Sequence, residues 1–95
     1  MFNDLDPLIH SQLRLAIMSI LVGVEQAEFV FLKEKTNATA GNLSVQLEKL
    51  QQANYISIEK TFKGKYPLTI CRITTQGAEA FSKYVKNLQA YLRSA

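Results

Sequence analysis

The sequence predicts a mainly α-helical α+β domain, and three of its features carry the prediction. Leucines recur at helical spacing through residues 40–53. Two runs of alternating apolar and polar residues flank Lys63-Gly64-Lys65, and Thr74-Thr75-Gln76-Gly77 then opens an amphipathic stretch. A period of 3.6 residues indicates a helix and a period of two indicates a strand. The sequence therefore predicts helices first, then a hairpin, then a last helix.

The length and composition are those of one globular domain. A chain of 95 residues is expected to form a single domain over residues 1–95, and a hydrophobic content of 47% is too high for a disordered chain. Since only 20% of the residues are charged, part of the surface is expected to be covered by a partner.

No stretch of the chain suggests a membrane span or a secretory signal. The apolar run at residues 15–24 contains Ser19 and Gly23 and is too short to cross a bilayer. Asp4 and Asp6 lie where a signal peptide would carry Lys or Arg. We therefore expect a cytoplasmic protein without membrane contact.

The net charge of +3 is distributed unevenly along the chain. Residues 1–59 carry four basic and seven acidic side chains, whereas residues 60–95 carry seven basic and one acidic. This asymmetry favours a surface that faces a polyanion, although a solvated basic surface would have the same composition.

A first helix is predicted over residues 6–22. Asp6 is a good N-cap, Pro7 suits the first helical position, and Gly23 is expected to end the helix. Apolar residues cover most of its circumference, so we expect one side in the core and the other against a second subunit. The core stripe would consist of Ile9, Leu13, Ala16, Ile17 and Ile20.

Residues 25–53 are predicted to form two helices joined by a short polar turn. The first spans about residues 25–35, and Asn37 in the turn tolerates a left-handed backbone. The second spans about residues 40–53, with Thr39 as its N-cap and Asn54 just past its end. Its core stripe is Leu43, Leu47 and Leu50, and this leaves a polar face opposite.

A hairpin and a long helix complete the chain. Residues 55–73 are predicted to form two strands, with Ile56, Ile58 and Phe62 on one face and Tyr66 packed against the base of the hairpin. Thr74 or Thr75 is expected to cap a last helix over residues 75–93. The apolar stripe of that helix would be Ala78, Phe81, Tyr84, Val85, Leu88 and Leu92.

The residue types that catalysis or metal binding needs are scarce. The single histidine, His10, lies in the predicted first helix, and the single cysteine, Cys71, is expected to be a small core residue. Asp4 and Asp6 are explained by helix capping. We expect no internal disulfide, no metal site, no cofactor and no enzymatic activity.

The order of elements and three local motifs resemble a known family. The motifs are Asn42-Leu43-Ser44-Val45-Gln46-Leu47-Glu48-Lys49-Leu50, then Ala53-Asn54-Tyr55-Ile56, then Thr74-Thr75-Gln76-Gly77. Together they resemble the small winged helix-turn-helix transcriptional regulators related to the MarR and ArsR groups. The resemblance implies a homodimer on palindromic double-stranded DNA, with helix 40–53 in the major groove, a two-stranded wing on the backbone, and the first and last helices as the dimer interface.

Helix 40–53 would carry most of the base contacts. Asn42 has the donor and acceptor that match adenine, and Val45 can pack on a thymine methyl group. Thr39 can both cap the helix and donate to a phosphate, although capping alone explains it. Ser44 and Gln46 flank the face. Lys49 can pair with phosphate or stay solvated beside Glu48.

The wing would supply phosphate contacts through its basic residues, which are Lys60, Lys63, Lys65 and Arg72. No acidic residue lies between Lys60 and Arg72. Lysines on an edge hairpin also protect against aggregation, and that function alone would explain them.

Three functions are compatible with these observations. The first is a dimeric, sequence-specific DNA-binding regulator, and more specifically a repressor. The second is a winged helix that binds proteins and not DNA, which Val45, Glu48 and the modest net charge favour. The third is single-strand or RNA binding, against which the lack of aromatic residues on an exposed strand face argues. A small-molecule effector stays an open question.

Overall fold

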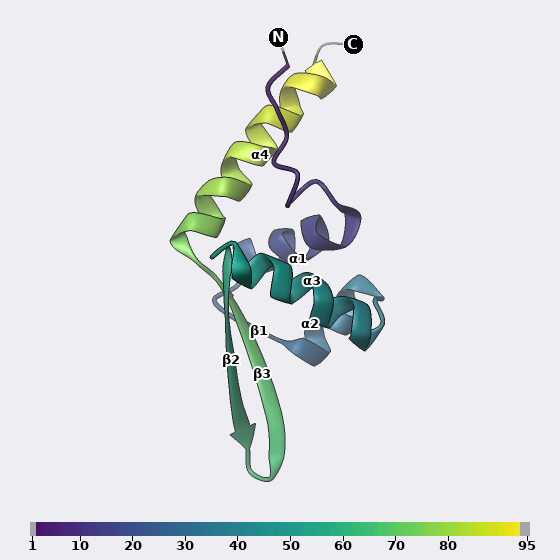
Figure 1. Cartoon of the computed structure of the whole chain (residues 1–95), viewed down its shortest axis with the longest axis vertical. Helices are drawn as coiled ribbons and strands as arrows, with labels where there is room; N and C mark the ends of the chain where they lie inside the picture. The colour runs from purple at the N-terminus through teal and green to yellow at the C-terminus, as the bar shows by residue number, and fades with distance from the viewer. Residues whose placement is uncertain (1, 94–95) are drawn as a thin grey trace.

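The computed structural model describes residues 2–93 and confirms the mainly α-helical α+β fold. Within this range the elements are α1 (Gln12–Val22), β1 (Ala27–Glu28), α2 (Phe29–Thr36), α3 (Ala40–Gln52), β2 (Ile56–Lys63), β3 (Tyr66–Ile73) and α4 (Thr75–Arg93). Helices α1, α2 and α3 form the body (Figure 1). The β2–β3 hairpin leaves it at one end and α4 at the other, so the molecule measures 53 × 25 × 21 Å.

The first helix begins later than the predicted residue 6. Asp6 caps a separate turn, in which its Oδ1 accepts from Leu8 N at 2.9 Å and its carbonyl accepts from His10 N at 2.8 Å. The Leu8 carbonyl then accepts from Arg14 Nε, and α1 starts only after Ser11. The prediction of residues 6–22 as one helix is therefore wrong at its N-terminal end.

A short strand stands where the second predicted helix should begin. Ala27 pairs with Cys71 and Glu28 with Ile70, so β1 adds to the hairpin in the antiparallel order β1-β3-β2. The sheet thus has three strands within the described residues, where the sequence predicted two. Two residues are too few for an alternating pattern, so only the tertiary pairing reveals this strand.

The core forms where the body meets the base of the hairpin. Leu43, Leu47 and Leu50 of α3 are buried, as their spacing predicted. They belong to one cluster with buried residues of the other elements, which are Ile17, Met18, Leu21, Ala27, Leu32, Ile56 and Cys71. This packing fixes α3 with its opposite face outward.

The turns around α3 use the residues that the sequence singled out. Asn37, with φ of 57°, and Asn54, with φ of 62°, both adopt the left-handed conformation. Thr39 caps α3 by accepting from Asn42 N at 3.1 Å. Because Asn is one of the few residues that adopts positive φ readily, these two positions set the directions in which the chain enters and leaves α3.

Helix α4 starts against the end of α3. Thr74 is its cap, since Thr74 Oγ1 accepts from Gly77 N at 2.9 Å and donates to the Asn54 carbonyl at 2.6 Å. A Cβ on Gly77 would lie 2.0 Å from the Tyr55 carbonyl oxygen, so only glycine allows this approach. The predicted apolar stripe is partly wrong, because Leu92 is 72% exposed while Gly77 and Asn87 are buried.

An N-terminal arm, residues 2–9, runs along α4 in the opposite direction (Figure 1). Asn87 Nδ2 donates to the Asp4 carbonyl at 3.2 Å, and the Phe2 and Tyr91 rings stack with centroids 4.6 Å apart. Lower on the arm, Tyr55 Oη donates to Asp6 Oδ2 at 2.5 Å. These contacts hold the arm to the C-terminal half of α4 and to Tyr55, which follows α3.

Candidate nucleic-acid interface

The exposed surface of α3 divides into three strips. A central ridge consists of Val45, Lys49 and Gln52, which lie at i, i+4 and i+7 and are all exposed. One flank faces the hairpin and the other faces α1. The ridge is mostly polar, and Val45, which is 49% exposed, is its apolar member.

The flank toward the hairpin borders an open groove of about 750 Å³. One wall of the groove belongs to α3 and consists of Ser44, Glu48 and Gln51. The other wall belongs to the hairpin and consists of Lys60 and Thr69, and the floor is formed by Phe29, Leu47 and Ile58. Lys60 pairs with Thr69 across the strands, so both point into this groove. Lys60 therefore faces α3 across the groove, opposite the acidic Glu48.

The flank toward α1 carries a chain of hydrogen bonds. Gln46 Nε2 donates to Asn42 Oδ1 at 3.0 Å, and Gln46 Oε1 accepts from Arg14 Nη1. Two predicted contact residues are therefore already joined to each other and to α1. Nothing in the sequence singled out Arg14, because its partner lies 32 positions away.

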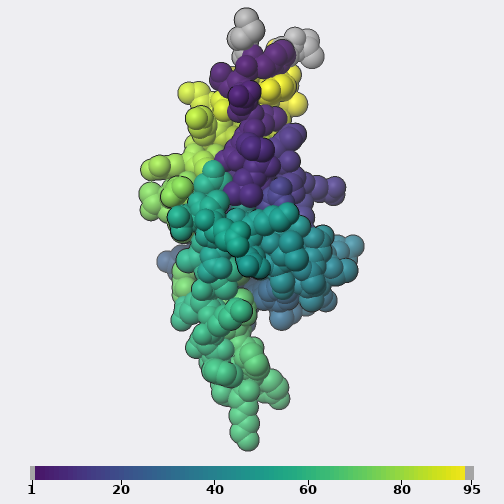
Figure 2. All heavy atoms as spheres, viewed as in Figure 1, coloured from purple at the N-terminus to yellow at the C-terminus, as the bar shows by residue number. Residues whose placement is uncertain are grey.

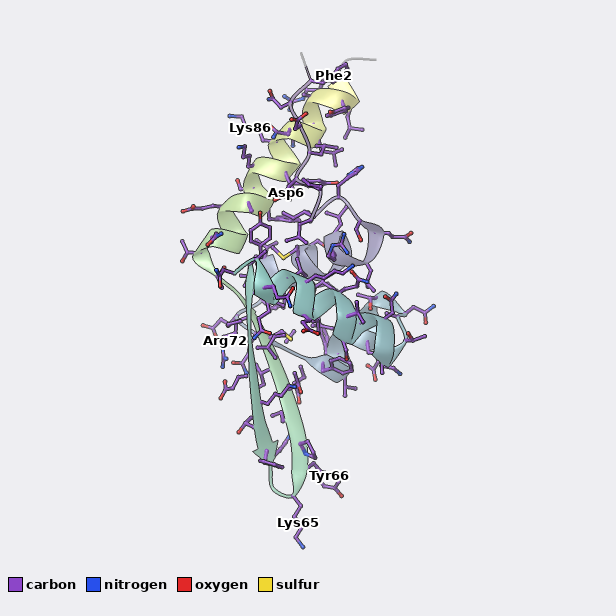
Figure 3. All side chains as sticks on the ribbon, in the orientation of Figure 1. Phe2, Asp6, Lys65, Tyr66, Arg72 and Lys86 are labelled. Carbon is purple, nitrogen blue, oxygen red and sulfur yellow. The ribbon has the colours of Figure 1, made fainter. Side chains whose placement is uncertain are left out.

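The hairpin projects from the body (Figure 2), and basic and aromatic residues lie at its tip. Gly64 has φ of 63° and is the first of two turn residues, as is typical of a type II′ hairpin turn. Lys63 and Lys65 are exposed there, and Lys65 extends from the very end (Figure 3). The predicted lysine-bearing tip thus projects into solvent.

Two aromatic rings at the tip are also exposed, against expectation. Phe62 is 70% exposed and Tyr66 is 78% exposed, so neither packs against the hairpin or the core. The hairpin is too long for the body to reach its end, which is why the alternation that predicted burial fails there. Phe62 shares the α3-facing side of β2 with Lys60, whereas Tyr66 pairs with Lys63 on the other side.

Arg72 differs from the lysines because it is engaged within the protein. Its Nη1 forms an ion pair with Glu59 at 2.9 Å, and its Nη2 donates to Gln26 Oε1 at 2.7 Å. Figure 3 places it at the hairpin base, far from Lys65. Arg72 therefore ties the hairpin to the segment before β1, and its charge is balanced locally.

Comparison with known proteins agrees with this geometry. A family model described as a winged helix DNA-binding domain matches residues 13–92. The chain belongs to this family. A relative of this winged helix chain, the uncharacterized protein MJ0432 of Methanocaldococcus jannaschii, is 40% identical over 77 residues, which are 80% of this chain and 83% of that one.

Solved structures confirm the winged helix fold. A transcriptional regulator homologue from Pyrococcus horikoshii has a TM-score of 0.86 at 24% identity and covers 92% of this chain and 86% of that chain. PadR from Bacillus subtilis, solved in complex with operator DNA, has a TM-score of 0.65 at 17% identity and covers 84% and 57%. The predicted winged helix-turn-helix fold is thus confirmed, and in this fold α2 and α3 are the helix-turn-helix and β2–β3 the wing.

Cys71 and His10 of this winged helix domain lie in different surroundings. Burial raises the pKa of the Cys71 thiol to about 11, which keeps it protonated in the core. His10 Nδ1 and Tyr84 Oη are hydrogen bonded at 2.8 Å.

A cavity of about 330 Å³ lies between the N-terminal arm and α4, beside Asp6, Tyr55 and Lys83. None of the helices in the described part of the chain is long and apolar enough to cross a membrane.

Proposed function

We propose that this winged helix protein is a dimeric, sequence-specific transcriptional regulator of double-stranded DNA, and that it acts as a repressor. In the proposed complex α3 enters the major groove and the wing contacts the backbone beside it. The observation that carries the proposal is the placement of the α3 ridge next to a projecting hairpin with exposed Lys63 and Lys65. A B-DNA major groove about 12 Å wide admits one helix, and the wing then reaches the neighbouring phosphates.

The proposed contacts follow the exposed residues of the two elements. Asn42, Val45 and Lys49 present side chains outward from α3, and Ser44 and Lys60 line the groove beside it. Thr39 contributes the helix N-terminus, whose unpaired N–H groups favour phosphate. Arg72 and Gln46 contribute indirectly, since their polar atoms already have protein partners. Repression requires no more than occupation of the operator.

The dimer is proposed to form through α4 and the end of α1. Along α4, Tyr91 and Leu92 are exposed, and Val22 at the end of α1 and Val24 just after it are exposed as well. At about 1.5 Å per residue, the 19 residues of α4 extend roughly 28 Å, well beyond the body. A second copy would cover this apolar surface, and a two-fold axis would place two α3 helices about one DNA turn apart.

The test begins with selection of duplexes from a random pool, together with a mass measurement in solution. The selected site should be a palindrome with half-sites about one helical turn apart, and affinity should fall as salt rises. Lys63→Ala combined with Lys65→Ala should weaken binding to all duplexes and flatten the salt dependence. The log–log slope should decrease by about 0.9 for each phosphate that the wing no longer neutralises.

A matched control separates wing contacts from net charge. Lys83→Ala combined with Lys86→Ala removes the same charge from exposed residues of α4, and Lys86 lies far from the wing (Figure 3). This pair should leave the salt slope close to that of the wild type. Equal slopes for the two double variants would show that the wing makes no specific contact.

A protein-binding winged helix is the second candidate, and the exposed apolar surface of the helix-turn-helix favours it. Val30 is exposed on α2 and Val45 on α3, while Glu48 would repel phosphate. A gel shift against random duplexes at low salt distinguishes the two functions. No retardation at micromolar protein would refute the DNA-binding proposal and favour this one.

A further inference from the structure

We propose that Arg14 of α1 is a positioning residue that determines which atom of Asn42 α3 presents to a base, and so sets the base preference at that position. The inference rests on the proposed function, in which α3 enters the major groove. It concerns a hydrogen-bonded relay, defined here as Arg14, Gln46 and Asn42.

The relay is anchored at both ends. Arg14 is half-buried, and its Nε donates to the Leu8 carbonyl at 2.5 Å, which fixes the guanidinium against the N-terminal arm. Arg14 Nη1 then donates to Gln46 Oε1, and Gln46 Nε2 donates to Asn42 Oδ1 at 3.0 Å. At the far end, Asn42 N donates to Thr39 Oγ1, so the Asn42 backbone is held as well.

The polarity of the relay is dictated by its first member. A guanidinium has only N–H donors and no acceptor, so Gln46 must turn its Oε1 toward Arg14. The Gln46 NH₂ group then faces Asn42, and a group that can only donate requires the Asn42 oxygen. The orientation of both amides therefore follows from the presence of an arginine at position 14.

The consequence is a defined chemistry on the outer side of α3. Asn42 Oδ1 is engaged by Gln46, whereas Asn42 Nδ2 has no hydrogen-bond partner among residues 2–93. Adenine recognition by an asparagine uses both a donor and an acceptor, whereas guanine presents two acceptors, N7 and O6, to the major groove. Asn42 held in this way should favour guanine over adenine, which differs from the adenine match that its residue type alone suggested.

The base pair that Asn42 contacts is identified first, as the operator position at which Asn42→Ala abolishes the base preference. The test then compares binding to four operators that differ only at this base pair. For the wild type we expect at least fivefold tighter binding with guanine there than with adenine, about the smallest discrimination that a good bidentate contact to a base supplies, here from the two N–H groups of Asn42 Nδ2 to guanine N7 and O6. Arg14→Met keeps the aliphatic stem but removes every donor, so Gln46 can turn and the preference should fall below about twofold.

Gln46→Glu gives the sharper result. A carboxylate still accepts from Arg14 but cannot donate to Asn42, so the Asn42 amide should turn its NH₂ inward and its oxygen outward. The preference should then reverse toward a base with a major-groove donor, adenine or cytosine. Because each preference is a ratio within one protein, the added negative charge and any loss of folded fraction cancel.

The salt slope separates positioning from direct phosphate contact. If Arg14 only positions, the Arg14→Met slope equals that of the wild type. A slope flatter by about 0.9 per half-site, with uniform weakening and an unchanged preference, would make Arg14 a phosphate contact and overturn the proposal. An unchanged preference in both variants would also overturn it.

Failure of the proposed function has a different signature, because then the wild type binds no duplex at all. The relay itself is checked without DNA through the side-chain amide resonances of Asn42 and Gln46. Both NH₂ pairs should shift in Arg14→Met, and the Asn42 pair should shift in Gln46→Glu. Unshifted resonances would show that the relay does not exist in solution.

Discussion

Gly77→Ala should destabilise the domain even though alanine is the better helix former. Gly77 lies in the first turn of α4, where a Cβ would stand 2.0 Å from the Tyr55 carbonyl oxygen and 2.8 Å from its carbon. Both atoms are backbone and cannot turn aside. The start of α4 must therefore move away from Tyr55 by more than an ångström before ordinary contact at about 3.4 Å is restored.

The magnitude follows from three contributions. Overpacking against a fixed group costs about 1–3 kcal/mol. The displacement also weakens the hydrogen bond from Thr74 N to the Tyr55 carbonyl, which is 3.0 Å long and contributes about 1 kcal/mol. Replacing a helical glycine by alanine stabilises the helix by about 1 kcal/mol, which offsets part of this loss. The net loss should be about 2 kcal/mol, which corresponds to a fall in Tm of about 8–16 °C for a domain of this size.

Gly41→Ala provides the matched control, since Gly41 lies in the first turn of α3 and its Cβ would meet no atom within 4 Å. Urea and thermal unfolding of both variants should show Gly41→Ala at or above the wild-type stability, by up to about 1 kcal/mol. A Gly77→Ala variant as stable as the wild type would refute the steric reasoning and the close approach of α4 to Tyr55.

Two further predictions concern the cap of α3 and the N-terminal arm. Thr39→Ala removes the acceptor of Asn42 N and should cost about 1 kcal/mol in urea unfolding, while Thr39→Ser should retain most of it; equal losses in both would exclude capping as the cause. The hydrogen bond to Asp6, followed by burial, raises the pKa of Tyr55 from 10.0 to about 12. Because the folded state holds this proton more tightly than the unfolded chain, its stabilising contribution is present below pH 10 and is lost as pH rises toward 12. Tyr55→Phe should therefore lose less stability than the wild type between about pH 9 and about pH 11.5, and the titration of Cys71, which is common to both proteins, cancels in the comparison.

Local signals were sufficient for the elements whose stability is decided by their own residues. The spacing of Leu43, Leu47 and Leu50 placed α3 and its buried face, because a helix repeats every 3.6 residues whatever surrounds it. Thr39, Asn37 and Asn54 marked its boundaries, because a cap or a left-handed residue acts on its immediate neighbours. The order helix, helix, hairpin, helix followed from these signals and led to the winged helix family.

Contacts between distant residues settled the rest. The separate turn at Asp6, the strand at Ala27, the ion pair of Arg72 and the relay from Arg14 to Asn42 all depend on partners that no local pattern identifies. Exposure of Phe62 and Tyr66 likewise depends on how far the hairpin projects, and alternation along a strand does not report that distance. Residue types along the chain thus specify where α3 lies and which of its faces is buried, whereas the packing of α1 against α3 specifies how the polar side chains of Arg14, Gln46 and Asn42 are paired.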